Sequence, residues 1–353
     1  MITELEIKNF KSIKELNIQC GRLNVFVGTN SSGKSTIQQA ILFVGQNVEE
    51  ATGLNGKYMK LGELEEVRCQ YGENKEIQVK ITDESDHQVT KILRRDGETN
   101  KLRLTTTPSK KQPMPIQVTD RQFQYLSCHR IGPSALYKKN MTLDEELGND
   151  GEFAIAYLNQ HGSDELEPQL CRGDEDYTLL GQVNWWLDYI VGAQISTEEI
   201  SGTDFVKATY QMNEVRNIRP GNIGSGISYL ISILIMCLSS PKGGIMVIEN
   251  PEIHLHPAAQ SKLCEFCYFI ISADRQIFME THSDHIFNGF RVGLANETMK
   301  DDMVNIQFTY FNHEHLTQTE KVKIGKYGRV ENQSKDLFDQ FDIDLNKMLG
   351  IEG

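Results

Sequence analysis

The sequence is short of positive charge: 36 Lys and Arg stand against 49 Asp and Glu in 353 residues, a formal net charge of −13. Because Lys and Arg bind the phosphates of nucleic acids, this balance argues against a nucleic-acid-binding surface over the whole protein, while leaving room for a local basic strip. Long apolar runs are absent too. The longest, ISYLISILIMCL at 227–238, is too short to span a bilayer and predicts a buried helix.

Signs of secretion and of disulfide stabilisation are also lacking. No basic segment leading into an apolar stretch opens the sequence, and its seven cysteines are scattered. We therefore expect free thiols, a cytoplasmic location and no membrane association. The one C-x-x-C pair, Cys264 and Cys267, could join His254 and His256 in a zinc site. Its helical spacing within an apolar stretch favours core packing instead.

Hydrophobic patterning divides the chain into three predicted parts. Residues 1–135 contain a strand pair, a strand that leads into a long helix, and an antiparallel β subdomain at about 55–118, with EEVRCQYG (65–72) as one of its strands. Residues 136–200 are acidic and favour helix, which predicts a helical insertion. Residues 201–353 return to alternating strands and helices, so the expected fold class is α/β.

The turn GTNSSGKS at 28–35 fits G-x-x-x-x-G-K-[ST], the phosphate-binding loop. Gly28 and Gly33 let the backbone turn tightly and approach an anion, and the loop amides form an anion-binding nest at the start of a helix. Lys34 adds a charge for the β- and γ-phosphates, and the Ser35 hydroxyl can ligate Mg²⁺. The predicted nucleotide-binding residues of this turn are Gly28, Thr29, Asn30, Ser31, Ser32, Gly33, Lys34 and Ser35.

Two buried strands end in polar residues that could meet such a nucleotide. GIMVIENPE places Glu249 at a strand end, as the expected magnesium partner of Ser35, and Glu252 three residues later, where it could orient the attacking water. QIFMETHSDHI delivers His282 to the end of a second strand, where it could bond the γ-phosphate or that water.

A Gly-rich turn precedes the 227–238 helix. In NIGSGIS, Gly224, Ser225 and Gly226 could present a second helix N-terminus to phosphate, although an ordinary helix cap explains the same residues. The position of this turn, just before the helix and strand that lead to Glu249, favours the phosphate-binding interpretation.

The order of these motifs resembles the ABC-type ATPase head, and more narrowly the branch that contains RecF, SMC heads and OLD nucleases. The segments that carry the resemblance are ELEIKNFKSIKELNI, GRLNVFVGTNSSGKST, ENPEIHLHP and ETHSDHI. The tail IGKYGRVENQSKDLFDQFDIDLNKML resembles bacterial predicted ATPases of anti-phage defence operons, including Septu-type systems. The resemblance covers nearly the whole chain and is weakest at residues 70–120 and 141–200.

The resemblance implies a mixed central sheet and an ATP-sandwiched homodimer, alone or in a larger assembly. It adds Thr36 to the ATP and Mg²⁺ site, makes His282 the switch histidine, and makes Gly224–Gly226 the signature turn that reaches the γ-phosphate held by a second subunit. For this chain we expect control of a separate effector, such as a nuclease encoded nearby, through which the complex could contact nucleic acid.

Two departures from the family pattern leave alternatives open. The family's Asp-Glu strand ending is Glu249-Asn250 here, and Asn cannot act as a general base. Either Glu252 takes that role, or hydrolysis is slow and the protein is an ATP-held scaffold. The acidic pattern of a Toprim nuclease domain is also lacking, so we expect no nuclease activity in this chain. A RecF-like DNA-repair ATPase is a third alternative, and Gln122 and Gln124 are candidates for the Q-loop glutamine.

Overall fold

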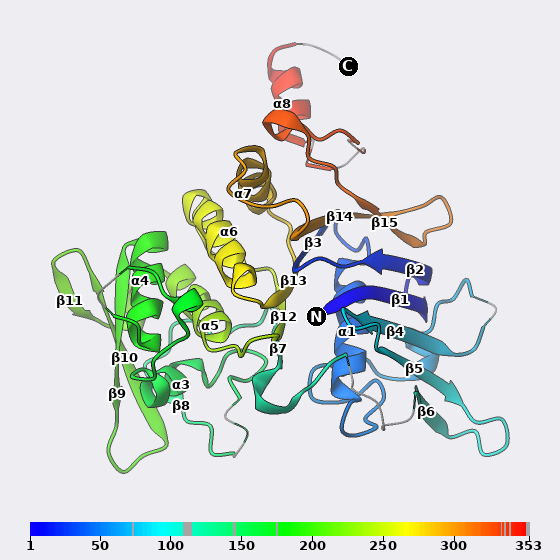
Figure 1. The fold of residues 1–353 in the computed structure, drawn as a ribbon, viewed down its shortest axis with the longest axis horizontal. Coiled ribbons are helices and arrows are strands. Elements are labelled where there is room, and N and C mark those ends of the chain that lie inside the picture. Colours follow the sequence, from blue (N-terminus) through cyan, green and yellow to red (C-terminus); the bar gives the residue numbers. More distant parts are fainter. Residues whose placement is uncertain are drawn as a thin grey trace.

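A six-stranded sheet forms the centre of the computed structural model (Figure 1). The structure describes residues 1–72, 74–108, 115–142, 144, 146–173, 176–332, 334, 337–338 and 340–350, without the side chains of 340–343. The strands follow the order β15 (Thr317–Lys321), β14 (Val304–Phe311), β3 (Leu23–Gly28), β13 (Gln276–Glu280), β12 (Ile245–Glu249) and β7 (Phe123–Leu126). All neighbours are parallel except β15, which runs antiparallel to β14.

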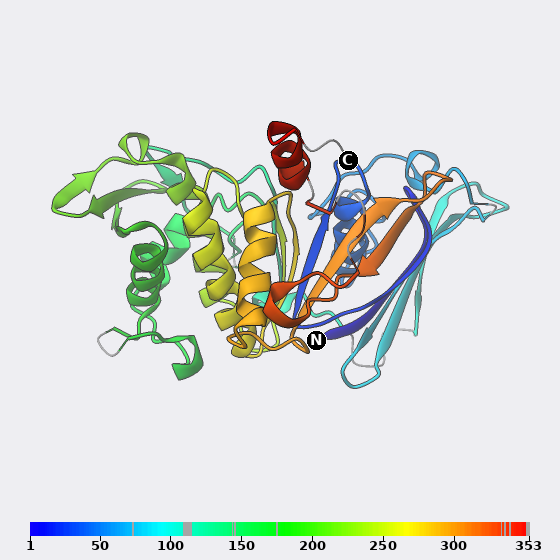
Figure 2. The ribbon, with the colours of Figure 1, turned by 90° about the horizontal axis from the view of Figure 1, so that it is seen from above.

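The central strands β3, β13 and β12 are mostly apolar and almost entirely buried because both faces of the sheet are covered (Figure 2). One face packs on α1 (Lys34–Gln46). The other packs on α5 (Ser225–Leu238), α6 (Pro257–Ser272) and α7 (Asp284–Ala295). Residues alternate between the faces with the two-residue period of a strand, so Val247 and Phe278 lie on the α1 side.

A five-stranded antiparallel sheet lies beyond α1 in the order β2 (Ile13–Gln19), β1 (Ile2–Phe10), β4 (Ile77–Asp83), β5 (Gln88–Arg95) and β6 (Leu102–Thr107). This confirms the predicted β subdomain and shows that the N-terminal strand pair belongs to it. EEVRCQYG is not a strand: it begins inside a short helix, α2 (Leu64–Val67), whose start carries a capping box between Glu63 and Glu66.

The third part combines helices and strands. It contains α3 (Ala154–His161) and α4 (Leu179–Val191), the helices expected of a helical insertion at 136–200, and strands as well. The segment includes β8 (Tyr137–Lys138) and ends in β9 (Ala193–Glu199); both pair with β10 (Phe205–Met212), which also pairs with β11 (Val215–Ile218). Because β10 lies in the predicted third part, the boundary at residue 200 cuts through a sheet.

The remaining elements are short: η1 (Thr119–Arg121), η2 (Pro168–Leu170), η3 (Pro220–Asn222), η4 (Lys326–Gly328) and the tail helix α8 (Gln340–Met348). Helix α5 is buried along most of its length, as predicted. Cys264 and Cys267 are core residues of α6, all seven cysteines are free, and no cluster of three or more potential metal ligands occurs within the described ranges. In the same ranges, no helix has both the length and the apolarity needed to cross a bilayer.

Candidate functional site

The phosphate loop joins β3 to α1 and rests directly on β14 and β15. Gly28 has φ 147° and Gly33 has φ 105°, both in the region that favours glycine. A Cβ atom added to Gly28 would lie 2.1 Å from the Thr309 carbonyl oxygen, and one on Gly33 would lie 2.2 Å from the Thr317 hydroxyl. That hydroxyl donates to the Ser32 carbonyl at 2.9 Å. The glycines therefore let the loop pack against the sheet edge as well as turn.

Lys34 opens α1 and is held inside the loop. Its ammonium donates to the carbonyls of Gly28 at 2.8 Å and Thr29 at 2.7 Å, and the residue is only 3 % exposed. Burial lowers the pKa of this ammonium to about 8, against the opposing effect of Glu280 and Glu252. No side chain caps the helix and its first turn has no acid, so the positive end of α1 is offered to an external anion.

Ser35 contacts Glu280, which was not among the site residues predicted from the sequence. Its hydroxyl donates to Glu280 at 2.7 Å. Strand order explains the pairing: β13 lies next to β3, whereas β12, which carries Glu249, is one strand further away. Burial raises the pKa of Glu280 to about 7, with Glu249 adding to the rise, while Ser35 and Lys34 oppose it. The sequence did contain a signal for Glu280: it is an acidic residue at the end of a buried strand, immediately before Thr281 and His282.

Glu249, the predicted partner of Ser35, is hydrogen-bonded instead by β7 and by the turn that follows β7. One carboxylate oxygen accepts a hydrogen bond from the Tyr125 hydroxyl at 2.8 Å and the other from the Cys128 amide at 3.0 Å. The buried Arg130 guanidinium donates to the carbonyls of Glu249 and Asn250, both at 2.6 Å. Asn250 follows with φ 42°, so the chain turns sharply directly after the strand.

Glu252 and His282 lie together, beside Lys34 and Glu280. The His282 amide donates to one Glu252 oxygen at 2.9 Å. The other oxygen, Oε2, is buried and has no hydrogen-bond partner among the described residues. Burial lowers the pKa of His282, as does Lys34, against an opposing effect of Glu252. The fold thus brings the phosphate loop, Glu252, Glu280 and His282 into one electrostatic cluster.

The Gly-rich turn starts α5 and lies against the turn that follows β12. Gly224 is exposed, Ser225 is half-buried, and Gly226 is buried where an added Cβ would lie 2.3 Å from the His254 carbonyl oxygen. No side chain caps this helix either. Within the described ranges, no hydrogen bond links Gly224–Gly226 to the phosphate loop of the same chain.

The candidate Q-loop residues lie at β7. Gln124 is a strand residue whose buried side-chain amide nitrogen has no partner in the described part of the chain, and Gln122 immediately precedes the strand. Among the residues that the structure describes, no hydrogen bond joins either glutamine to the phosphate loop. The turn after this strand carries Cys128 and Arg130, and both residues donate hydrogen bonds to Glu249 at the end of β12.

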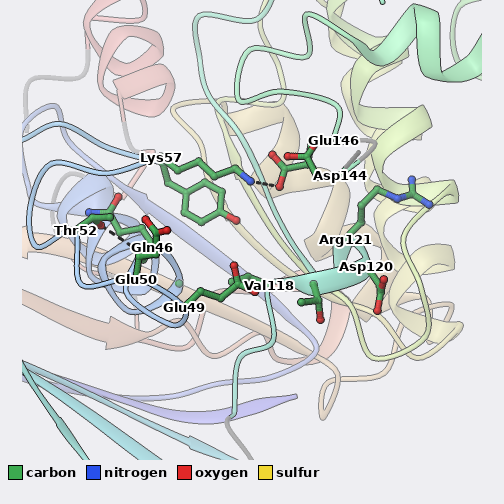
Figure 3. Close-up of a pocket in the computed structure, with 13 residues that line it drawn as sticks. Gln46, Glu49, Glu50, Thr52, Lys57, Val118, Asp120, Arg121, Asp144 and Glu146 are labelled. Carbon is green, nitrogen blue, oxygen red and sulfur yellow. Dashed lines mark hydrogen bonds and ion pairs between the residues drawn. The ribbon is translucent and has the colours of Figure 1, made fainter. Parts of the chain in front are cut away.

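A separate polar cavity of about 620 Å³ lies at the opposite end of α1 (Figure 3). Its wall includes Gln46, Tyr58 and Arg121, and an ion pair between Lys57 and Glu146 runs beside it. None of the phosphate-loop residues lines it, so this cavity is not the nucleotide site.

Comparisons with solved structures concern the fold. The SMC head domain from Thermotoga maritima is 12% identical, with a TM-score of 0.52 and coverage of 92% of this chain and 99% of that one. An Smc head domain with an extended coiled coil, bound to the C-terminal domain of ScpA from Pyrococcus furiosus, is 13% identical, with a TM-score of 0.58 and coverage of 99% of both chains. An SmcHead bound to the C-winged helix domain of ScpA is also 13% identical, with a TM-score of 0.56. These likenesses establish the fold.

No curated protein sequence matches the chain. The family model described as "AAA ATPase domain" matches residues 1–156 and 185–287, which is well over half of the chain. The fold predicted from the sequence, an ATPase head of the ABC and SMC type, is therefore confirmed, and the chain belongs to the AAA ATPase domain family, whose members bind and hydrolyse ATP.

Proposed function

We propose that this chain is a Mg²⁺-dependent ATPase that dimerises around nucleotide and controls a separately encoded effector, such as a nuclease, in bacterial anti-phage defence. The observation that carries the catalytic part is the convergence of Lys34, Ser35, Glu280 and Glu252 from three different elements at the phosphate loop. Such a cluster of buried, mutually perturbed ionisable groups is typical of a functional site.

The residues present fit a magnesium-bound triphosphate. The loop amides and Lys34 would bind the phosphates. Ser35, Glu280 and Glu249 offer the hard oxygen ligands that Mg²⁺ prefers, directly or through water. The ion would neutralise charge on the phosphate oxygens. Because the Glu280 pKa is near 7 in the isolated chain, a cation at this place would also favour its ionised form.

Glu252 is the best candidate for orienting the attacking water. Its Oε1 is fixed by the His282 amide, while the buried Oε2 lacks a partner among the described residues and could accept from water. His282 lies beside it, burial lowers its pKa and so favours the neutral imidazole, and the ring could donate one hydrogen bond to the γ-phosphate.

The dimer part of the proposal is supported by the second turn. Gly224 and Ser225 are at least partly exposed at the uncapped start of the 14-residue helix α5, and no hydrogen bond among the described residues ties this turn to the phosphate loop of its own chain. In a two-fold dimer it could face the triphosphate held by the other subunit. Two of the similar head structures are bound to a domain of ScpA, which supports control of a separate protein partner by a head of this fold.

A second candidate, an ATP-held scaffold with little turnover, is favoured by Asn250 at the position of the family's second acid. Phosphate release from pre-bound ATP separates the two. For an ATPase that uses Glu252, wild type and Asn250→Ala release phosphate, whereas Glu252→Gln binds ATP but loses release by about 100-fold or more. Stoichiometric ATP retained by wild type without phosphate release would instead favour the scaffold.

A further inference from the structure

The Glu249 carboxylate is fixed from behind by β7 and the turn after it. The Tyr125 hydroxyl bonds Oε1 at 2.8 Å and the Cys128 amide bonds Oε2 at 3.0 Å. Arg130 fixes the main chain at the same place through the carbonyls of Glu249 and Asn250. One segment, residues 125–130, therefore sets both the backbone position and the two carboxylate oxygens of Glu249, and the Tyr125 hydroxyl is its side-chain donor to Oε1.

Strand register explains how Tyr125 reaches this carboxylate. β7 runs parallel to β12 with Tyr125 opposite Val247, so the two side chains project from the same face, towards α1. Glu249 lies two residues beyond Val247 and projects from that face as well. The phenol thus extends along the strand direction to the acid. The Tyr58 ring supports it edge-on, at 6.4 Å between ring centroids and 86° between planes.

We infer that Tyr125 is a positioning residue of this ATPase site: its hydroxyl occupies one lone pair of the Glu249 carboxylate and fixes the orientation in which the remaining lone pairs would hold a magnesium ion. The inference rests on the proposed role of Glu249 at the magnesium ion. Residues that hydrogen-bond to a metal-binding carboxylate orient it, and their loss typically lowers metal affinity or activity by about 10–100-fold.

Tyr125→Phe tests the inference, because it removes the hydroxyl and keeps the buried ring. We expect kcat for phosphate release to fall by about tenfold, and the Mg²⁺ concentration for half-maximal rate to rise by about tenfold, with the KM for ATP within about twofold of wild type. The Mg²⁺ midpoint reports only on folded, active molecules, so partial unfolding of the variant does not mimic this result.

Tyr58→Phe is the matched control. It removes a phenol hydroxyl from the adjoining ring, and that hydroxyl has no hydrogen bond within the described residues. Its kcat and Mg²⁺ midpoint should equal those of wild type. If Tyr125→Phe behaves in the same way as this control, the positioning role is overturned.

Glu249→Gln distinguishes failure of the inference from failure of the function on which it rests. A strong loss of hydrolysis in Glu249→Gln, combined with a normal Tyr125→Phe, removes only the positioning role of Tyr125. Normal hydrolysis and an unchanged Mg²⁺ midpoint in Glu249→Gln remove the proposed role of Glu249 at the metal, and the inference falls with it.

Discussion

Replacing Glu280 by Gln should stabilise the ligand-free protein in a pH-dependent way. Glu280 is 4 % exposed, and burial raises its pKa from 4.5 to about 7. The native state therefore binds this proton more tightly than the unfolded chain does, and the free energy of unfolding falls as pH rises from about 4.5 to about 7. At about 1.4 kcal/mol per pKa unit, the full cost of ionising Glu280 is about 3 kcal/mol at pH 8.

Glu280→Gln removes that titration while keeping an oxygen to accept from Ser35. The difference in unfolding free energy between variant and wild type should therefore grow by up to about 3 kcal/mol from pH 4.5 to pH 8 in favour of the variant, with most of the change below pH 7. Urea denaturation at several pH values, in EDTA and without nucleotide, measures it, because bound metal would itself favour the ionised carboxylate.

The exposed Glu65 provides a control of opposite sign. Its bidentate hydrogen bonds with Arg95 lower its pKa to about 2, so any stability it contributes is present above its unfolded pKa and is lost as pH falls towards 2. Glu65→Gln should therefore never gain on wild type between pH 4.5 and 8. A Glu280→Gln difference that is constant over the same range would show that Glu280 ionises normally and would refute the electrostatic argument.

Three further predictions concern the two glycine turns. Lys34→Ala should abolish ATP binding, measured by calorimetry, with an unchanged far-UV spectrum; retained affinity would contradict the proposed site. Gly226→Ala should lower the free energy of unfolding, measured by urea denaturation, by about 1–3 kcal/mol, because its Cβ would lie 2.3 Å from the His254 carbonyl oxygen. Gly224→Ala has open space around the new methyl group, so its free energy of unfolding should be within about 1 kcal/mol of wild type. Equal effects of the two substitutions would disprove this packing argument. Ser225→Arg should leave ATP binding intact but prevent ATP-dependent dimerisation in sedimentation experiments; a nucleotide-dependent dimer in this variant would contradict the dimer proposal.

Much of the fold follows from local sequence pattern. Strands such as Ile245–Glu249 are short apolar runs that end in polar residues, and α1 starts where the glycine loop ends. These features depend on residues a few positions apart, so they are predictable. The failures occurred where local pattern is ambiguous: EEVRCQYG alternates like a strand but includes a capped helix, and β9 lies in an acidic, helix-favouring region.

The sequence by itself determined the chemistry available: a glycine loop for phosphate, a Lys and a Ser at the start of a helix, and acids at two strand ends. Tertiary structure alone decided which acid meets which group. Because β13 is inserted between β3 and β12, Ser35 bonds Glu280, and because β7 pairs with β12 in register, Tyr125 and Cys128 hold Glu249. Strand order and register join residues more than a hundred positions apart, and no local periodicity encodes them.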